Sequence, residues 1–418
     1  MIPTRFRHAR ALAIALTAGL LAGGATLGAR AEESGGKNTV RPEIGKPLQD
    51  AQKLIADRKY KEALAKLQQA DGVRDKTAYE SFVVEEIRGA AARGAGDMPT
   101  AIRSFEAVVA ANRLPPPDQL RYVQSLAVTY YTVKDYPQAI AWSSRYLKQG
   151  GTDGQVHTLL AQSYYLAGDY TGATTELKAQ LAAADRAGQS LPESALTMLA
   201  DSALKQKDDA GYSEALQRLV AAYPKTEYWL PLLHQIERAP GFAGRLQLDL
   251  DRIKLATGTL RGSGDYLAMA QLALAGGLPG EARKIVEQGY AAGILGSGAD
   301  AERHRRLRDL AEKSAAEDRN TLDKGIGEAA AQKDGGGLVN TGLDYLGYGE
   351  TEKGVGLIER GIEKGNLRRP EDGKLHLGLA YIAAGQKAKA IEILKTVQGS
   401  DGTADIARAW ILFARAST

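Results

Sequence analysis

Apolar residues recur along the chain at the spacing of an α-helix. Two segments illustrate the pattern: LAVTYYTVKDYPQAI at Leu126–Ile140 and LAQSYYLAGDYTGAT at Leu160–Thr174. In each, an alanine (Ala127 or Ala161) is followed three positions later by a tyrosine, so both side chains lie on one helix face. Ala, Leu, Gln, Glu, Lys and Arg dominate the periodic segments, without the alternation that is typical of strands. The pattern predicts an all-α protein.

The two segments also repeat each other. At an offset of 34 residues they share Leu, Ala, Tyr, Tyr, Asp, Tyr and Ala in register. The final alanine of each copy is Ala139 or Ala173. Two helices joined by a tight turn approach closely only where side chains are small, and aromatic rings then fill the space on either side. The sequence therefore predicts a helix pair that recurs along the chain.

The second half of this helix pair is found at further positions. Its small residue occurs at Ala63, Ala101, Ala139, Ala173, Ala215, Ala282, Gly354 and Ala390. Successive members are separated by 38, 38, 34, 42, 67, 72 and 36 residues, so each of the two longest gaps is close to two repeats. We therefore expect a degenerate pair within residues 226–260 and another within residues 296–333, which gives about ten hairpins.

The period of 34 resembles that of the tetratricopeptide repeat (TPR) family, whose signature combines a small residue, spaced aromatics and a later alanine. The resemblance is strong at 85–182 and 338–398 and weaker at 225–335. The tryptophan that is usual in the first helix is missing, and the family's proline is clear only at Pro224. The resemblance implies one right-handed α-solenoid of antiparallel helix pairs, a TPR-like superhelix.

On this interpretation the chain has six segments. They are a signal peptide at 1–31, a flexible leader at 32–45, N-terminal TPR-like repeats at 46–224, degenerate helical repeats at 225–337, C-terminal TPR-like repeats at 338–398 and a capping helix at 399–418. Each unit of an array leaves one face open, so an end cap is expected. We expect Ile406, Trp410 and Phe413 to pack onto the final repeat.

The N-terminal residues have the three parts of a secretory signal peptide. Three arginines within the first ten residues form a basic start, an apolar run continues to about Leu27, and a small-x-small cleavage site follows at 29–31. The run is interrupted by glycine and is shorter than the ~20 residues of a spanning helix, which favours cleavage over retention as an anchor. The mature chain is then expected in the bacterial periplasm, without stable membrane insertion.

Charge and cysteine content exclude several classes of protein. The net charge of +4 equals the four arginines of residues 1–31, which contain no acidic residue, so the rest of the chain is neutral. A neutral chain offers no general attraction for nucleic acid, whose binding depends on neutralising phosphates. The absence of cysteine excludes disulfides, thiolate metal sites and a cysteine nucleophile.

No catalytic or metal-binding constellation is found in the sequence. The histidines beyond the signal segment are scattered, at His157, His234, His304 and His376. No zinc-protease motif, phosphate-binding loop or nucleophile elbow occurs. The arginine-rich stretch at 302–313 is interpreted as a solvated face neutralised by its own acidic residues, in preference to an anion site. We expect a non-enzymatic protein with no cofactor and no bound metal.

The tyrosine doublets indicate a partner-binding surface. Neighbouring residues on a helix point about 100° apart, so Tyr130 and Tyr131 cannot both fill the space inside a helix pair. If Tyr130 and Tyr164 pack inside, Tyr131 and Tyr165 face the concave groove, where the resemblance places partner contacts. The same face is expected to present Arg93, Arg121, Gln124, Thr158 and Gln162. The alternative, that Tyr131 and Tyr165 only cover an adjacent helix, stays open.

The resemblance implies a periplasmic protein–protein interaction scaffold. Its partner is expected to be a protein or peptide of the cell envelope, held in the concave face of the superhelix. The alternative is an accessory protein of envelope polysaccharide export or cell-wall assembly. Sugar binding favours exposed aromatic platforms, and the additional aromatic residues that offer one are Tyr228, Trp229 and Tyr348.

Overall fold

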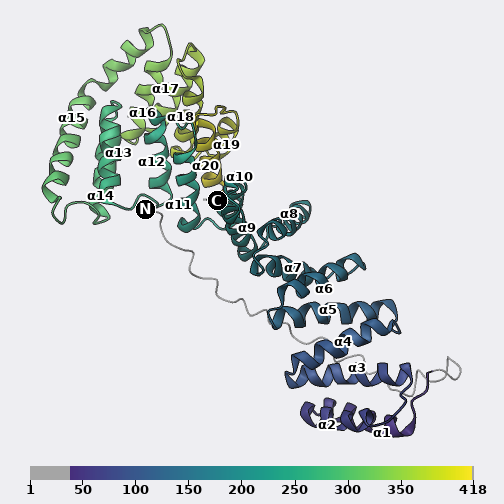
Figure 1. The fold of residues 1–418 in the computed structure, drawn as a ribbon. Coiled ribbons are helices and arrows are strands. Elements are labelled where there is room, and N and C mark those ends of the chain that lie inside the picture. Colours follow the sequence, from purple (N-terminus) through teal and green to yellow (C-terminus); the bar gives the residue numbers. More distant parts are fainter. Residues whose placement is uncertain (1–37, 417–418) are drawn as a thin grey trace. The chain divides into compact units, whose positions relative to one another are not determined.

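The computed structural model describes residues 38–416 (Figure 1). This part of the chain forms twenty α-helices and one short 3₁₀ helix and contains no strand, which confirms the all-α solenoid class. The predicted signal peptide and most of the predicted leader lie outside the described residues. The last four residues of the leader, 42–45, belong to the first helix. The chain divides into two compact units, with the boundary between Ala167 and Gly168.

The N-terminal unit consists of three helix pairs and a seventh helix. Its elements are α1 (Pro42–Ala56), α2 (Tyr60–Asp71), α3 (Ala78–Ala95), α4 (Met98–Ala111), α5 (Pro116–Thr132), α6 (Tyr136–Lys148) and α7 (Gly154–Leu166). Each helix packs against the next one along the chain, and α5 also packs against α7. Its buried residues form two adjoining apolar clusters, one spanning α1–α4 and the other α3–α7, as expected for an array in which each repeat contacts its neighbours.

The C-terminal unit holds the remaining helices. They are α8 (Tyr170–Arg186), α9 (Glu193–Lys205), α10 (Asp209–Ala222), α11 (Thr226–Arg238), the 3₁₀ helix η1 (Gly244–Leu246), α12 (Gln247–Ala256), α13 (Ser263–Ala275), α14 (Pro279–Ala291), α15 (Ala301–Ala331), α16 (Gly336–Gly347), α17 (Thr351–Lys364), α18 (Pro370–Ala383), α19 (Lys387–Lys395) and α20 (Thr403–Ala416). Pairing of neighbours continues through α9–α10, α13–α14, α16–α17 and α18–α19.

The small residues that define the repeat lie at the centre of the packing. All seven alanines of the set have no exposed surface, and Gly354 is buried as well. The pair α16–α17 is the tightest case, because a Cβ atom at Gly354 would lie 2.8 Å from the carbonyl oxygen of Gly342. That distance is too short for a side chain, so the two backbones touch there. The predicted role of the small positions is confirmed.

The Asp that precedes the second helix of each copy has a capping role. The carboxylate of Asp135 accepts a hydrogen bond from the backbone N–H of Gln138 at 3.2 Å, and Asp169 accepts one from Gly172 at 2.8 Å. Such a cap satisfies a backbone donor that the first turn of a helix leaves unpaired. Gly168, which precedes Asp169, has φ of +80°, a conformation that glycine adopts without strain.

One of the two predicted degenerate pairs is present and the other is not. Residues 226–260 contain α11 and α12, as predicted. Residues 296–333 instead form mainly one helix, α15, of 31 residues, so the prediction of a helix pair there is wrong. The physical reason is that its buried positions continue in a single helical register from His304 to Ala329, and no glycine or proline interrupts residues 301–324.

The last helix does more than cap the final repeat. Helix α20 packs on α18 and α19, as predicted, and it also packs on α10, α11 and α12 from much earlier in the chain (Figure 1). Beside it, the backbone N–H of Ala243 donates a hydrogen bond to the carbonyl oxygen of Asp401 at 2.9 Å. The C-terminal unit therefore closes on itself, whereas an open array would end at its last repeat.

The packing of Ala139 predicts a stability difference within one helix. Replacing Ala139 by Leu should lower the free energy of unfolding by about 1–3 kcal/mol, because the added atoms have no room between α5 and α6. The matched control is Ala141→Leu on the exposed side of α6, which should change it by no more than about 0.5 kcal/mol. Denaturant unfolding of both variants measures the difference, and equal midpoints would refute the packing role.

Candidate functional site

Two of the predicted groove residues of the N-terminal unit meet directly. The hydroxyl of Tyr131 on α5 donates a hydrogen bond to Oε1 of Gln162 on α7 at 3.0 Å. The ring of Tyr131 also meets that of Tyr136 edge-on, with centroids 6.0 Å apart. On the same two helices, Nε2 of Gln124 donates to Oδ2 of Asp153, the N-cap of α7, at 2.6 Å. Two side-chain hydrogen bonds thus join α5 to α7 and its N-cap.

The other predicted groove residues are Arg93, Arg121, Thr158 and Tyr165, and they differ in burial. Arg121 is exposed and pairs with Asp118 on α5. The guanidinium of Arg93 lies over the ring of Phe105 at 5.8 Å, and burial lowers the pKa of Arg93. Thr158 is exposed, and its hydroxyl donates to a carbonyl of its own helix. Tyr165 is half-buried on α7.

Tyr130 and Tyr164, the two tyrosines that were predicted to pack inside the repeats, differ in burial. Tyr130 is 9 % exposed, so its predicted burial is confirmed, and its hydroxyl donates to Oε1 of Glu106 on α4, in the preceding helix pair, at 2.5 Å. Burial, together with the carboxylate of Glu106, raises the pKa of Tyr130. Tyr164 is only half-buried. The second copy of the doublet therefore follows the pattern less closely than the first.

The C-terminal unit contains an apolar cavity that the sequence did not indicate. Its volume is about 580 Å³, and six helices line it: α12, α13, α14, α16, α18 and α20. Each of these helices contributes an apolar side chain, in turn Leu255, Met269, Ile285, Leu343, Ile382 and Phe413. The charged and amide side chains of the lining come from α12 and α14 and are Arg252, Glu281, Lys284 and Gln288. The return of α20 is what supplies the last wall.

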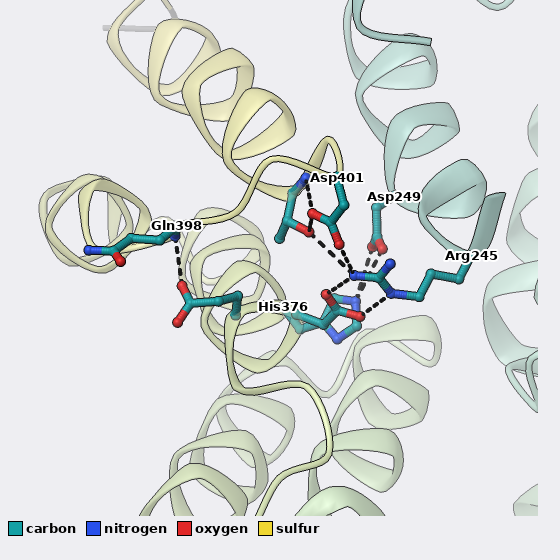
Figure 2. Close-up of polar contacts among 8 residues, drawn as sticks. Arg245, Asp249, His376, Gln398 and Asp401 are labelled. Atoms are coloured by element: carbon teal, nitrogen blue, oxygen red, sulfur yellow. Dashed lines mark hydrogen bonds and ion pairs between the residues drawn. The ribbon is translucent and has the colours of Figure 1, made fainter. Parts of the chain in front are cut away.

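A network of buried charges lies at one side of this cavity. Arg252 donates two hydrogen bonds to Glu281, at 2.7 and 2.6 Å, and one to Asp249 at 2.5 Å. Asp249 also lies 3.1 Å from Nε2 of His376 on α18 (Figure 2). Burial alone would raise the pKa of Asp249, but His376 and Arg252 outweigh it and hold that pKa at about 2. The network joins α12 to α14 and α18.

A second charge cluster fixes the start of α20. Arg245 of η1 donates to both carboxylate oxygens of Asp372, each at 2.9 Å, and to Oδ2 of Asp401 at 2.7 Å (Figure 2). The hydroxyl of Thr403 donates to Oδ1 of Asp401 at 2.7 Å. The hydrogen bond from Arg245 is the main reason why the pKa of Asp401 falls to about 2. Ion pairs thus connect η1 with the beginnings of α18 and α20.

One carboxyl group near the cavity has its pKa shifted in the opposite direction. Asp344 on α16 is buried, and its Oδ1 has no hydrogen-bond partner among the described residues. Burial is the main cause and contact with Asp318 of α15 the second cause that raise the pKa of Asp344 to about 8. Asp318 in turn accepts a hydrogen bond from the hydroxyl of Tyr348 at 2.8 Å. Asp344 is therefore mostly protonated at neutral pH in the folded chain.

Comparison with known families identifies the repeats. The family model described as "Tetratricopeptide repeat" matches residues 194–226, which contain nearly all of α9 and all of α10, and residues 372–400, which contain most of α18 and all of α19. The chain is thus an all-helical array that carries tetratricopeptide repeats, as the sequence predicted. No curated protein sequence matches the chain.

Three of the solved structures that match the chain share little sequence with it. The Naa15/Naa10 complex bound to HypK-THB is 16 % identical with a TM-score of 0.30; the alignment covers 85 % of this chain and 58 % of that one. A tetratricopeptide repeat protein from Parabacteroides merdae is 11 % identical with a TM-score of 0.32, at coverages of 81 % and 98 %. Yeast Tom70 is 12 % identical with a TM-score of 0.26, at coverages of 90 % and 95 %.

Residues 38–416 contain neither a metal-binding cluster nor a membrane-spanning helix. Between residues 38 and 416, no group of three or more His, Asp or Glu side chains is placed so that it would hold a metal ion. Over the same range, no helix combines the length and the apolar character that crossing a bilayer requires.

The raised pKa of Asp344 predicts how stability depends on pH. The folded chain keeps a proton that the unfolded chain, with an ordinary Asp pKa near 3.9, releases. The stabilising effect of this proton is therefore greatest below about pH 4 and is lost as the pH rises to about 8, at up to about 1.4 kcal/mol per pH unit. Asp344→Asn should remove this slope from the free energy of unfolding.

Urea unfolding at pH 5, 7 and 9 tests this prediction. The difference between wild type and Asp344→Asn should shift in favour of the variant as the pH rises. The control is Asp309→Asn on the exposed side of α15, which should follow the wild-type curve. Parallel curves for wild type and Asp344→Asn would show that Asp344 does not titrate in this range.

Proposed function

We propose that this protein is an interaction scaffold of the bacterial cell envelope. In this proposal the chain is exported to the periplasm and binds a polypeptide partner along the surface that α5 and α7 share. The tetratricopeptide repeats support the role of scaffold, because stacked helix pairs present extended binding surfaces. The basic, apolar and small-residue parts of residues 1–31 support export.

The hydrogen bond between Tyr131 and Gln162 is the observation that carries the proposal. It joins the first helices of two successive repeats, so their exposed side chains act as one surface. Gln162 accepts this hydrogen bond with its amide oxygen. In the proposal, the NH₂ group of the same amide donates to a carbonyl of the bound peptide. Half-buried tyrosines beside such an amide offer apolar area and hydrogen bonding together, a combination that is common at binding hot spots.

This proposal predicts that removing the two tyrosines abolishes binding while the fold is kept. Tyr131→Ala combined with Tyr165→Ala should eliminate capture of the partner by a photo-crosslinker placed at Thr158, which is exposed on α7. Each ring at the centre of an interface contributes about 2 kcal/mol or more to binding. The readout is the yield of the crosslinked partner from the periplasmic fraction of the producing bacterium.

The matched control is Tyr130→Ala, which removes the neighbouring buried ring. Because Tyr130 is buried, this change should lower the free energy of unfolding by roughly 3–5 kcal/mol, far more than the groove pair does. Undiminished capture by the Tyr131/Tyr165 double variant would contradict the proposed surface. A chain recovered only from the cytoplasmic fraction would contradict the proposed location.

A further inference from the structure

We propose that the cavity of the C-terminal unit binds one free long-chain fatty acid. Its hydrocarbon chain would fill the apolar interior, and its carboxylate would lie beside Lys284. This site belongs to the C-terminal unit alone and does not depend on the polypeptide-binding surface of α5 and α7.

The size and walls of the cavity suit a single hydrocarbon chain. A volume of about 580 Å³ lies within the range of roughly 300–1,000 Å³ that is usual for small-molecule sites. Apolar side chains from all six helices line it. Moving a methylene group of the ligand from water into such a site lowers the free energy of binding. A lipid with two acyl chains carries about twice the hydrocarbon, so a ligand with one chain fits better.

The interior is poorly suited to a peptide backbone. An extended peptide brings N–H and C=O groups that need partners, and Arg252 and Glu281 already satisfy each other inside the cavity. A helix satisfies its own backbone, but at a diameter of about 10 Å and a rise of 1.5 Å it occupies roughly 100 Å³ or more per residue. The cavity would hold little more than one turn of it. A hydrocarbon chain has no backbone groups to satisfy.

The charges on the lining favour an anionic head group. Arg252 is neutralised by Glu281 and Asp249, so it offers no free positive charge. Lys284 is exposed and lies one turn along α14 from Glu281. It forms no ion pair with any other residue between 38 and 416. Gln288 follows one further turn along, also on the lining. An ammonium and an amide at this spacing can both donate hydrogen bonds to one carboxylate.

Trp410 lines the cavity and gives a direct readout of binding. Titration of the full chain with a bromine-labelled C16 fatty acid should quench tryptophan fluorescence in a saturable way, because bromine quenches an indole ring that it contacts. Trp410→Phe should lose most of this quenching, since the other tryptophans, Trp142 and Trp229, do not line the cavity. Quenching that does not saturate, or that Trp410→Phe leaves unchanged, would overturn the proposal.

Two kinds of variant separate the head-group contact from the hydrocarbon contact. Lys284→Gln, on the exposed side of α14, should weaken binding of the fatty acid about tenfold and leave the affinity for the fatty alcohol of the same length unchanged. Ala383→Trp, which projects a large ring into the cavity from the end of α18, should abolish binding of both ligands. The control Ala388→Trp, exposed on α19 and away from the lining, should bind both ligands like wild type.

The remaining outcomes also decide the question. Equal loss of acid and alcohol binding in Lys284→Gln would refute the carboxylate contact. Unchanged binding in a folded Ala383→Trp would refute the cavity as the site, and Ala256→Trp at the end of α12 provides a second blocking variant. Binding to vesicles of anionic phospholipid without binding of the free acid would show that the ligand is a membrane lipid, and displacement of the acid by an apolar peptide would show a polypeptide site.

Discussion

Close approach of two helices at a small residue is the constraint on which every repeat depends. At Ala139 the side chain is fully buried between α5 and α6, and at Gly342 and Gly354 the backbones of α16 and α17 touch. A larger side chain at such a point separates the two helices and shifts the surface on which the next pair packs. Because each pair is positioned by its neighbour, one small residue per repeat determines the course of the array.

Charged side chains determine how the C-terminal unit closes. Apolar helix faces pack on one another with little selectivity, but a buried carboxylate such as Asp249 is very unfavourable unless a cation faces it. Arg252 meets this requirement for Asp249, His376 contacts the same carboxylate, and Arg245 pairs with the partly exposed Asp401. These pairs place α18 and α20 against the helices near residue 250. The closure creates the apolar cavity, on whose lining Lys284 forms no ion pair with any other residue of 38–416.

Local patterns in the sequence were sufficient to predict the repeats, but not the contacts between distant segments. The small residues and the Asp caps act within one helix pair, so their spacing can be recognised without the structure. Asp249 and His376 are 127 residues apart, and nothing beside either residue indicates the other. Tyr131 and Gln162 were each predicted on the groove face, whereas their hydrogen bond depends on how α5 and α7 pack. Repeat spacing alone predicts a helix pair where α15 forms a single helix, and the signal against a pair is the absence of glycine and proline within 301–324.

The closure can be measured most directly with an engineered disulfide, because the chain contains no cysteine of its own. Ala243 and Asp401 are joined by a backbone hydrogen bond of 2.9 Å, and the Cα atoms of a disulfide typically lie about 4.4–6.8 Å apart. Mild oxidation of the folded Ala243→Cys, Asp401→Cys variant should form an intramolecular bond between these residues in nearly every molecule, and the same treatment in denaturant should not. Two free thiols in this variant, together with rapid hydrogen exchange of the Ala243 amide in the wild-type chain, which keeps the Asp401 carboxylate, would contradict the return of α20 to α10–α12.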